Sequence, residues 1–435
     1  MSASVEQRTV RRITWRIVPF IMLLYFIAFI DRVNIGFASL TMNKDIGLSP
    51  SAFGFGAGIF FLGYFVFEVP SNLILEKVGA RLWIARVMVT WGVISAAMAF
   101  VRGPVSFYAL RFLLGAAEAG FFPGIILYLS YWFPARHRAG VTALFMAAAP
   151  VSTALGSPLS AALLEMNGVL GFAGWQWLFV LEAIPAVVLG VVTFFFMTDR
   201  PAQARWLPGD ERAWLVETMD AEVASRTGHA SHSPWRGLFD PRVLALSLVY
   251  FGTSAGLYTL GIWAPQIIKQ LGVSSMTVGL LNAVPPTVSV VAMVLWARHS
   301  DRTGERSWHV VIACLLASAG LLMAGKVGAS LAGVVLALTL VNIGISSAKA
   351  PLWSMPTLFL SGPAAAAGIA TINSIGNLGG FVGPSMIGWI KQRTGSFAGG
   401  LYFVGALLVI SAAVTLVLAH RARRPVPAAV PAQVP

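Results

Sequence analysis

Charged side chains are scarce in this chain of 435 residues, because Asp, Glu, Lys and Arg together make up only 11% of it. A water-soluble protein usually carries about 25% of these residues. Hydrophobic residues account for 57% of the chain, and its mean hydropathy is +0.77. The composition excludes an ordinary water-soluble protein and indicates a protein that lies within a membrane.

Cysteine is nearly absent, and several common catalytic motifs do not occur. The single cysteine, Cys314, excludes an intrachain disulfide. The six histidines lack the spacing of metal ligands, and neither HExxH nor a phosphate-binding P-loop occurs. We therefore expect no enzymatic activity, no metal and no cofactor.

What the chain does have is a series of long apolar runs. Each is close to the ~20 residues that a helix needs to cross the ~30 Å of hydrocarbon in a bilayer. We predict an all-α membrane protein of twelve transmembrane helices, with spans at 15–38, 53–75, 82–101, 105–133, 139–164, 175–197, 243–268, 277–298, 308–326, 330–358, 366–391 and 398–420.

The longest polar segment, 198–242, divides these spans into two sets of six. Within it we predict a short surface helix at 207–223 and a flexible stretch at 225–234. The Pro- and Ala-rich end of the chain is typical of disorder. The predicted organisation is therefore an N-terminus at 1–14, a six-helix bundle at 15–197, a central loop at 198–242, a second six-helix bundle at 243–420 and a disordered tail at 421–435.

The net charge of +13 comes from 30 Lys and Arg residues against 17 Asp and Glu residues. Twelve spans place the N-terminus, the central loop and the tail on one side of the membrane. Most of the Lys and Arg residues fall in these three segments and in the connections between spans on that side. Basic residues gather on the cytoplasmic side of membrane proteins, so both termini are predicted to be cytoplasmic. The basic excess reports topology, and we expect no nucleic-acid partner.

Two connecting loops carry related motifs, one in each half. The loop after the second span reads NLILEKVGAR (72–81), and the loop after the eighth reads ARHSDRTGER (297–306). Both resemble the loop signature of the major facilitator superfamily, G-x-x-x-D-R-x-G followed by Arg, and the first copy departs from it more than the second. The resemblance implies two pseudo-symmetric six-helix bundles that rock about a central site. It also implies a gating role for Glu76, Arg81, Asp301, Arg302 and Arg306.

Ionisable residues inside the predicted spans are few, and they are Asp31, Arg32, Glu68, Arg111, Glu118, Glu182 and Lys349. Such residues usually face a cavity, pair with each other and mark the path of a substrate or a proton. Asp31 and Arg32 are adjacent on one helix and so point ~100° apart. We expect Arg32 to face a central cavity and Asp31 to point towards the fourth span, where Asp31 or Glu118 would neutralise Arg111.

An arginine in such a cavity attracts anions, because its guanidinium is always charged and binds a carboxylate through two parallel hydrogen bonds. A buried carboxyl group beside it can exchange a proton when an anion arrives or leaves. These residues therefore predict proton-coupled anion symport. The alternative is that the charges form structural pairs between the first and fourth spans.

Longer motifs narrow the resemblance. Six segments of the chain resemble motifs of the anion:cation symporter family. They are IDRVNIG (30–36), RFLLGAAEAGFFPG (111–124), YWFPARHRA (131–139), GWQWLFVLE (174–182), WAPQIIK (263–269) and ATINSIGNLGGFVGP (370–384). This resemblance implies a bacterial inner-membrane importer of a tartrate-like, sugar-acid or aromatic carboxylate that moves with protons. It assigns substrate contact to Arg32 and Tyr64, protonation to Asp31 and Glu118, and the role of charge partner to Arg111.

The second half contributes further polar residues that we predict to bind substrate, namely Ser346, Lys349 and Trp353 in the tenth span and Asn373 and Asn377 in the eleventh. Their hydroxyl and amide groups favour a hydroxylated acid. Lys349 either faces the cavity as a second cation or extends towards the membrane surface, and both interpretations stay open.

The expected partners are thus a small carboxylate, protons and the lipid bilayer, and the expected functional unit is a monomer. An anion exchanger or exporter of the same fold, or a carboxylate sensor without transport, stays open as an alternative.

Overall fold

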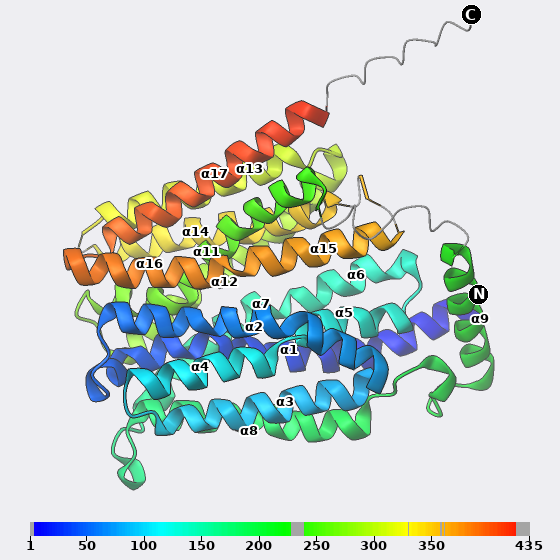
Figure 1. The fold of residues 1–435 in the computed structure, drawn as a ribbon, viewed down its shortest axis with the longest axis horizontal. Coiled ribbons are helices and arrows are strands. Elements are labelled where there is room, and N and C mark those ends of the chain that lie inside the picture. The colour runs from blue at the N-terminus through cyan, green and yellow to red at the C-terminus, as the bar shows by residue number, and fades with distance from the viewer. Residues whose placement is uncertain (1–3, 228–238, 329, 357–358, 361, 423–435) are drawn as a thin grey trace, which may run out of the picture.

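The computed structural model describes residues 4–227, 239–328, 330–356, 359–360 and 362–422. Long helices fill these ranges, and no strand occurs in them (Figure 1). The first half contains α1 (Val5–Asp45), α2 (Pro50–Val78), α3 (Ala80–Ala97), α4 (Pro104–Glu118), α5 (Phe121–Trp132), α6 (Ala135–Met146), α7 (Ala148–Leu164) and α8 (Gly174–Phe196). The second half contains α11 (Pro241–Lys269), α12 (Ser275–Thr303), α13 (Ser307–Lys326), α14 (Leu331–Ser354), α15 (Gly362–Asn377), α16 (Gly379–Thr394) and α17 (Ala398–Ala422), and α9 (Gly209–Thr227) lies between the halves in sequence.

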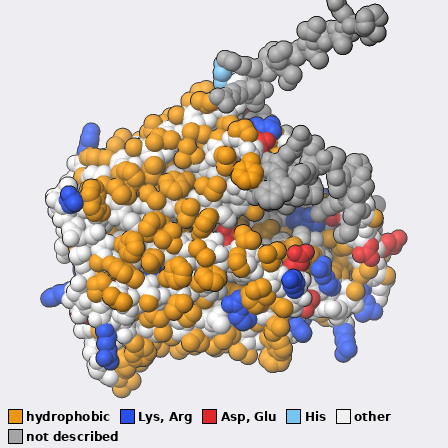
Figure 2. Space-filling view, in the orientation of Figure 1, with side chains coloured by type: hydrophobic (Ala, Val, Ile, Leu, Met, Phe, Trp, Pro, Cys, Tyr) orange, Lys and Arg blue, Asp and Glu red, His pale blue; other side chains and the backbone are white. Residues whose placement is uncertain are grey.

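Eleven helical stretches of the described chain are long and apolar enough to cross a membrane. The twelfth crossing is the pair α15 and α16, which follow one another with Leu378 between them. Hydrophobic side chains cover the middle of the surface in Figure 2, and Lys and Arg side chains gather towards its two ends. The predicted all-α membrane fold of twelve transmembrane helices is confirmed.

Two other predicted spans are also divided. The span predicted at 105–133 consists of α4 and α5, with a break at Ala119 and at Gly120, whose φ of 86° is readily adopted only by glycine. The carbonyl oxygen of Ala119 accepts a hydrogen bond of 2.6 Å from Ser71 Oγ of α2. The span predicted at 139–164 consists of α6 and α7. Such breaks are tolerated inside a membrane because neighbouring side chains satisfy the freed backbone groups.

Helix α1 begins at Val5, ten residues before the start of the first predicted span, and has 41 residues. Its first turn is stabilised by Ser4, whose side chain accepts a hydrogen bond of 3.3 Å from the backbone N–H of Gln7. The N-terminal segment that we predicted at 1–14 is therefore helical from Val5 onwards. It extends the first transmembrane helix rather than preceding it as a loop.

The surface helix predicted at 207–223 is confirmed as α9, and ion pairs hold it against this extension of α1. Arg8 pairs with Asp210 at 3.3 Å, and Arg12 pairs with Glu211 at 2.9 Å. Most of the stretch predicted to be flexible and nearly all of the predicted tail lie outside the described residues.

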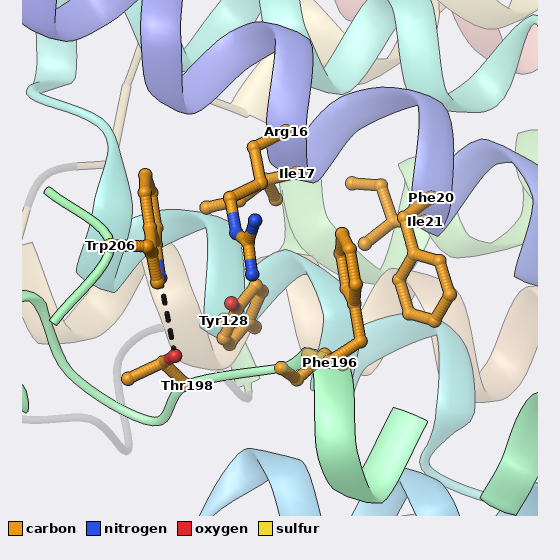
Figure 3. A pocket seen from close by; sticks show the side chains of 9 residues that line it. Arg16, Ile17, Phe20, Ile21, Tyr128, Phe196, Thr198 and Trp206 are labelled. Carbon is orange, nitrogen blue, oxygen red and sulfur yellow. Dashed lines mark hydrogen bonds between the residues drawn. The ribbon is translucent and has the colours of Figure 1, made fainter. Parts of the chain in front are cut away.

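The segment between α8 and α9 folds back onto α1. Figure 3 shows the guanidinium of Arg16 between the rings of Phe196 and Trp206, at 4.6 and 4.7 Å from the two ring centroids. Trp206 Nε1 donates a hydrogen bond of 3.4 Å to Thr198 Oγ1. Together with the ion pairs of α9, these contacts fasten the central segment to the first half of the molecule.

Both described ends of the chain and α9 lie at one end of the molecule, named here the terminal end (Figure 1). The opposite end, named the far end, holds the connection between α1 and α2. At the far end α2 packs closely along α16, and α7 packs along α12. Gln266 Nε2 donates to Ser39 Oγ at 2.8 Å, and Asn282 Nδ2 donates to Ser157 Oγ at 2.9 Å. The two halves are therefore in close contact at the far end.

Glycine allows this contact. A Cβ atom on Gly54 of α2 would lie 2.5 Å from the carbonyl oxygen of Pro384 in α16. Gly388 of α16 faces the same helix, and a Cβ atom there would lie 3.1 Å from the Cα atom of Gly54. Backbone atoms cannot move aside as a flexible side chain can, so neither position accommodates a larger residue while the far end is closed.

We expect Gly54→Val to open the far end. Overpacking of this kind costs about 1–3 kcal/mol, which corresponds to roughly a tenfold change in the ratio of open to closed molecules. Ser385→Cys places a thiol beside Gly54, and its reaction rate with a water-soluble maleimide measures the opening. The control is Gly209→Ala, whose Cβ atom meets no heavy atom within 4 Å. Equal labelling rates with and without Gly54→Val would contradict the prediction.

Candidate functional site

Arg32 lies between the two halves of the molecule. It comes from the middle of α1, and one of its terminal nitrogens, Nη2, donates to Glu118 Oε1 at the end of α4. The other, Nη1, donates a hydrogen bond of 3.1 Å to the hydroxyl of Tyr258 in α11. The side chains of Arg32 and Glu118 are 10% and 2% exposed. An ion pair within the first half is thus connected directly to the second half.

Aromatic rings surround this guanidinium. Its central carbon lies 5.5 Å from the ring centroid of Tyr64, 5.6 Å from that of Phe60 and 5.8 Å from that of Phe29. Rings at these distances attract a cation and exclude water. Arg32 Nε is buried and has no hydrogen-bond partner among the described residues. The guanidinium therefore keeps an unused donor for another acceptor.

Asp31 points away from this interface, into the first half. Trp91 Nε1 and Ser95 Oγ, both from α3, donate to its two carboxylate oxygens, and Asn34 Nδ2 donates to it at 3.1 Å. Its hydrogen-bond donors lie on α3 and on α1 itself, and Arg111 of the fourth span also acts on its charge. The expectation that Asp31 points towards the fourth span stays a prediction. The adjacent positions of Asp31 and Arg32 in the sequence determine the angle between their side chains. They do not determine how α1 is rotated about its own axis, and that rotation decides which helix each side chain faces.

Arg111 is buried near both acidic groups. Its Nη2 donates a hydrogen bond of 3.0 Å to the carbonyl oxygen of Ala57, and its guanidinium lies 4.9 Å from the centroid of the Phe60 ring. Asp31 and Glu118 both act on its charge. We expected either Asp31 or Glu118 to neutralise Arg111, and in the structure the charges of both carboxyl groups act on it.

Glu68 of α2 forms a second contact between the halves. Asn373 Nδ2 donates to its Oε1 at 2.5 Å, and Ser374 Oγ donates to its Oε2 at 2.9 Å. Asn373 was predicted to bind substrate, and in this structure its amide is occupied by Glu68. Its substrate role stays a prediction.

The other predicted substrate residues of the second half lie in α14 and α15. Ser346 is buried and its Oγ lies 3.4 Å from Ser289 Oγ, while the Trp353 ring packs edge-on against Tyr250 with centroids 4.9 Å apart. Asn377 is buried and Lys349 half-buried. Within the described chain, no hydrogen bond or ion pair connects these residues to Arg32, so the structure brings Tyr258, rather than any of them, to the guanidinium.

The two loop motifs form separate contacts at the terminal end. Asp199, just after α8, accepts a hydrogen bond of 2.8 Å from the backbone N–H of Arg81 and lies 3.8 Å from its Nε. In the second copy Arg306 pairs with Asp301 at 2.6 Å. The remaining predicted gating residues, Glu76 and Arg302, are exposed. The first copy is thus tied to the segment after α8, the second copy forms an ion pair within its own loop, and the gating role stays a prediction.

Sequence reasoning missed three partners in these networks, namely Trp91, Ser95 and Asp199. It named Glu68 as an ionisable residue within a span, because such a residue is rare, but assigned it no partner. Trp91 and Ser95 are one turn apart in the third span, which places an indole and a hydroxyl on one helix face. That pattern is common in membrane helices and does not identify an acidic partner.

One catalytic pattern does occur, since residues 252–256 read GTSAG and match G-x-S-x-G. In hydrolases this pattern lies in a sharp turn from a strand to a helix. Here it lies inside the continuous helix α11, so it does not form a nucleophile elbow. Among the described residues no cluster of His, Cys, Asp and Glu has the arrangement of a metal site.

Comparisons with known proteins place this chain in a family. Residues 21–384 match the family described as Major Facilitator Superfamily. A protein of Agrobacterium vitis described as "Putative tartrate transporter" is 73% identical over 422 residues, which are 97% of each chain. A "Quinolone resistance transporter" of Acinetobacter baumannii is 40% identical over 96% of each chain.

A solved structure shares the fold. It is a bacterial homologue of the human lysosomal transporter Spinster, in an inward-facing and unoccupied conformation. Its TM-score is 0.76, and the alignment covers 98% of this chain and 100% of that one, at 15% identity.

We expect Ser95→Ala to destabilise the first half, because it removes a donor from the buried carboxylate of Asp31. The oxygen concerned, Asp31 Oδ1, keeps Asn34 as a donor, so the loss is that of one hydrogen bond to a charged group, which costs about 1.5–3 kcal/mol. Thermal unfolding of the purified protein in detergent should therefore begin at a lower temperature. Thr90→Ala is the matched control on α3, since Thr90 Oγ1 bonds only to backbone carbonyls of its own helix. If the two variants unfold at the same temperature, Asp31 does not depend on α3.

Proposed function

The chain belongs to the major facilitator superfamily and is a membrane transporter rather than an enzyme, and we propose that it imports tartrate or a similar hydroxylated dicarboxylate together with protons. The observation that carries this proposal is the position of Arg32, which binds Glu118 of its own half and Tyr258 of the other. The high identity to the two Agrobacterium vitis proteins supports tartrate as the first substrate to test.

The coupling follows from competition for one guanidinium. Without substrate, Glu118 neutralises Arg32. A carboxylate of the substrate that binds Arg32 through two parallel hydrogen bonds displaces Glu118. A carboxylate left without a partner in a buried site is costly, so Glu118 takes up a proton. Anion and proton therefore bind together and leave together.

Transport then requires that the central site open to one side of the membrane at a time. The close contact of the halves at the far end supports a state that is shut on that side. The basic residues near the terminal end support a cytoplasmic position for that end. The protein itself would lie in the inner membrane of a bacterium. Ser346, Lys349, Trp353, Asn373 and Asn377 would complete the site from the second half, and a single chain would suffice as the functional unit.

An exporter of the same fold is the second candidate, favoured by the relative that is named for quinolone resistance. The direction of transport distinguishes the two. In proteoliposomes, labelled tartrate that accumulates when a proton gradient is applied, and stops accumulating when an uncoupler removes the gradient, supports symport. Loss of tartrate from loaded vesicles when the same inward proton gradient is applied indicates exchange of tartrate for protons and supports export.

We expect Arg32→Lys to weaken tartrate binding by about 100-fold or more. Lysine keeps the charge but loses the planar fork that binds a carboxylate and the hydroxyl of Tyr258 together, and a broken buried pair costs about 3 kcal/mol or more. Calorimetric titration with tartrate measures the change. Arg86→Lys is the control, because Arg86 stacks on Trp83 of α3 at 3.8 Å. Unchanged affinity in Arg32→Lys would exclude Arg32 as the anion ligand.

We expect Glu118→Gln to separate tartrate movement from the proton gradient. Glutamine is neutral at every pH, so it mimics the protonated carboxyl group and carries no proton across. Exchange of labelled for unlabelled tartrate should persist, whereas accumulation against a gradient should be lost. Glu165→Gln, at an exposed carboxyl group just after α7, should behave as the unmodified protein. Accumulation by Glu118→Gln would show that Glu118 is not the coupling group.

A further inference from the structure

Glu68 is a buried acidic residue that the mechanism above does not use. It is 5% exposed and lies in the part of α2 that approaches the terminal end. Both of its carboxylate oxygens accept hydrogen bonds from α15, one from Asn373 and the other from Ser374. An acidic side chain of the first half thus closes onto neutral donors of the second half.

This contact differs in kind from the contacts at the far end. There, α2 packs along α16 through glycine and backbone atoms, which leaves no room for water. At the terminal end α2 touches α15 only weakly, and the hydrogen bonds of Glu68 are prominent within that contact. The remainder of this part of α2 is tied to its own half, since Ser71 Oγ donates to the carbonyl oxygen of Ala119. The polar side chain of Glu68 therefore joins the halves where α2 meets α15.

The contact is strongest with an ionised carboxylate. An amide nitrogen and a hydroxyl group both donate to Glu68, and a carboxylate offers a charged acceptor on each oxygen. Protonation of Glu68 removes this charge, so the bonds that remain are between neutral groups, and the bond with the Ser374 hydroxyl can reverse its direction. Charge-assisted bonds of this kind are also roughly twice as strong as neutral ones.

Glu68 is also connected to the central site. Tyr64 precedes it by one helical turn and therefore lies on the same face of α2, and the Tyr64 ring lies under the guanidinium of Arg32. Arg32 is the cation that acts on Glu68, and Tyr64 is the titratable group beside it on α2. From α15 the groups that face Glu68 are the neutral Asn373 and Ser374. Occupation of Arg32 by an anion changes the charge that Glu68 experiences.

We propose that Glu68 is the gate of the terminal end, holding the two halves together when ionised and releasing them when it takes up a proton. It is thereby a second protonatable group of the transport pathway, in addition to Glu118. This inference rests on the proposed function for its connection to transport, while the gate itself is tested without substrate.

The test measures the distance between the halves at the terminal end. Nitroxide labels are attached through Leu82→Cys at the start of α3 and Trp308→Cys at the start of α13, two exposed positions, in the full chain carrying Cys314→Ala. Pulsed electron resonance in nanodiscs gives the distribution of distances. At neutral pH we expect the unmodified gate to give mainly short distances. Glu68→Gln should raise the ratio of long to short distances about tenfold, since it loses a bond to a charged acceptor.

Two further variants make the result specific. Ser374→Ala removes one donor and leaves the charge, and should shift the distribution in the same direction by a smaller amount. Glu182→Gln alters another buried carboxyl group, one that bonds to Ser160 within the first half at 2.6 Å, and should leave the distances unchanged. At acidic pH the unmodified gate should move towards the long distances that Glu68→Gln already shows.

If the distance distribution of Glu68→Gln coincides with that of the protein with an unmodified Glu68 at neutral and at acidic pH, Glu68 is not the gate. This outcome is separate from a failure of the proposed function, which would appear as no binding of tartrate by the unmodified protein in calorimetric titration. Tartrate binding together with unchanged distances would retain the transporter and reject Glu68 as its gate.

Discussion

A permanent positive charge between two moving halves is the constraint on which the rest of this structure depends. Arg32 has no neutral form at physiological pH, and its surroundings of Phe29, Phe60 and Tyr64 hold little water. Only an acceptor with a negative charge makes that position tolerable. Glu118 provides it in the empty protein, and an incoming anion provides it in the loaded one. If Glu118 becomes protonated as the anion binds, one carboxylate of the anion replaces Glu118 as the negative partner of Arg32, and the guanidinium is paired in both states.

The first half carries a second set of charges that serves a different purpose. Asp31 and Arg111 lie inside that half, where Trp91, Ser95 and Asn34 donate to Asp31 and a backbone carbonyl accepts from Arg111. A network with this many partners on several helices favours one arrangement of α1, α3 and α4. Arg32 projects from the same turn of α1 as Asp31, so the internal network also fixes the direction of the guanidinium. The second half contributes neutral groups to the observed contacts, namely the hydroxyl of Tyr258, the amide of Asn373 and the hydroxyl of Ser374.

The parts of this arrangement that follow from apolar length could be predicted from the sequence, and the parts that depend on rotation and pairing could not. Twelve spans were evident because each must be long enough to cross hydrocarbon. The break at Gly120 was not evident, since the two short helices beside it have the composition of one long helix. Arg32 could be identified as a candidate site residue because a charged side chain within a span is costly and is usually functional. The partners of Asp31 and Glu68 could not be assigned, because they lie on helices far away in sequence, and many residues of the same types occur in the spans.

The two ends of the molecule are closed by different physical means, and this difference bears on how a transporter can be controlled. Close packing through Gly54 and Gly388 depends on shape, so it responds to no proton and to no ion. Hydrogen bonds to Glu68 depend on charge, so a single proton alters them. In an alternating mechanism the two ends of the molecule must not be open at the same time, but only one end needs to respond to the chemical state of the site. The polar end supplies that response because Glu68 lies one turn from Tyr64, which contacts the same guanidinium that would bind the anion. The packed end follows, since rigid halves that separate at one end draw together at the other.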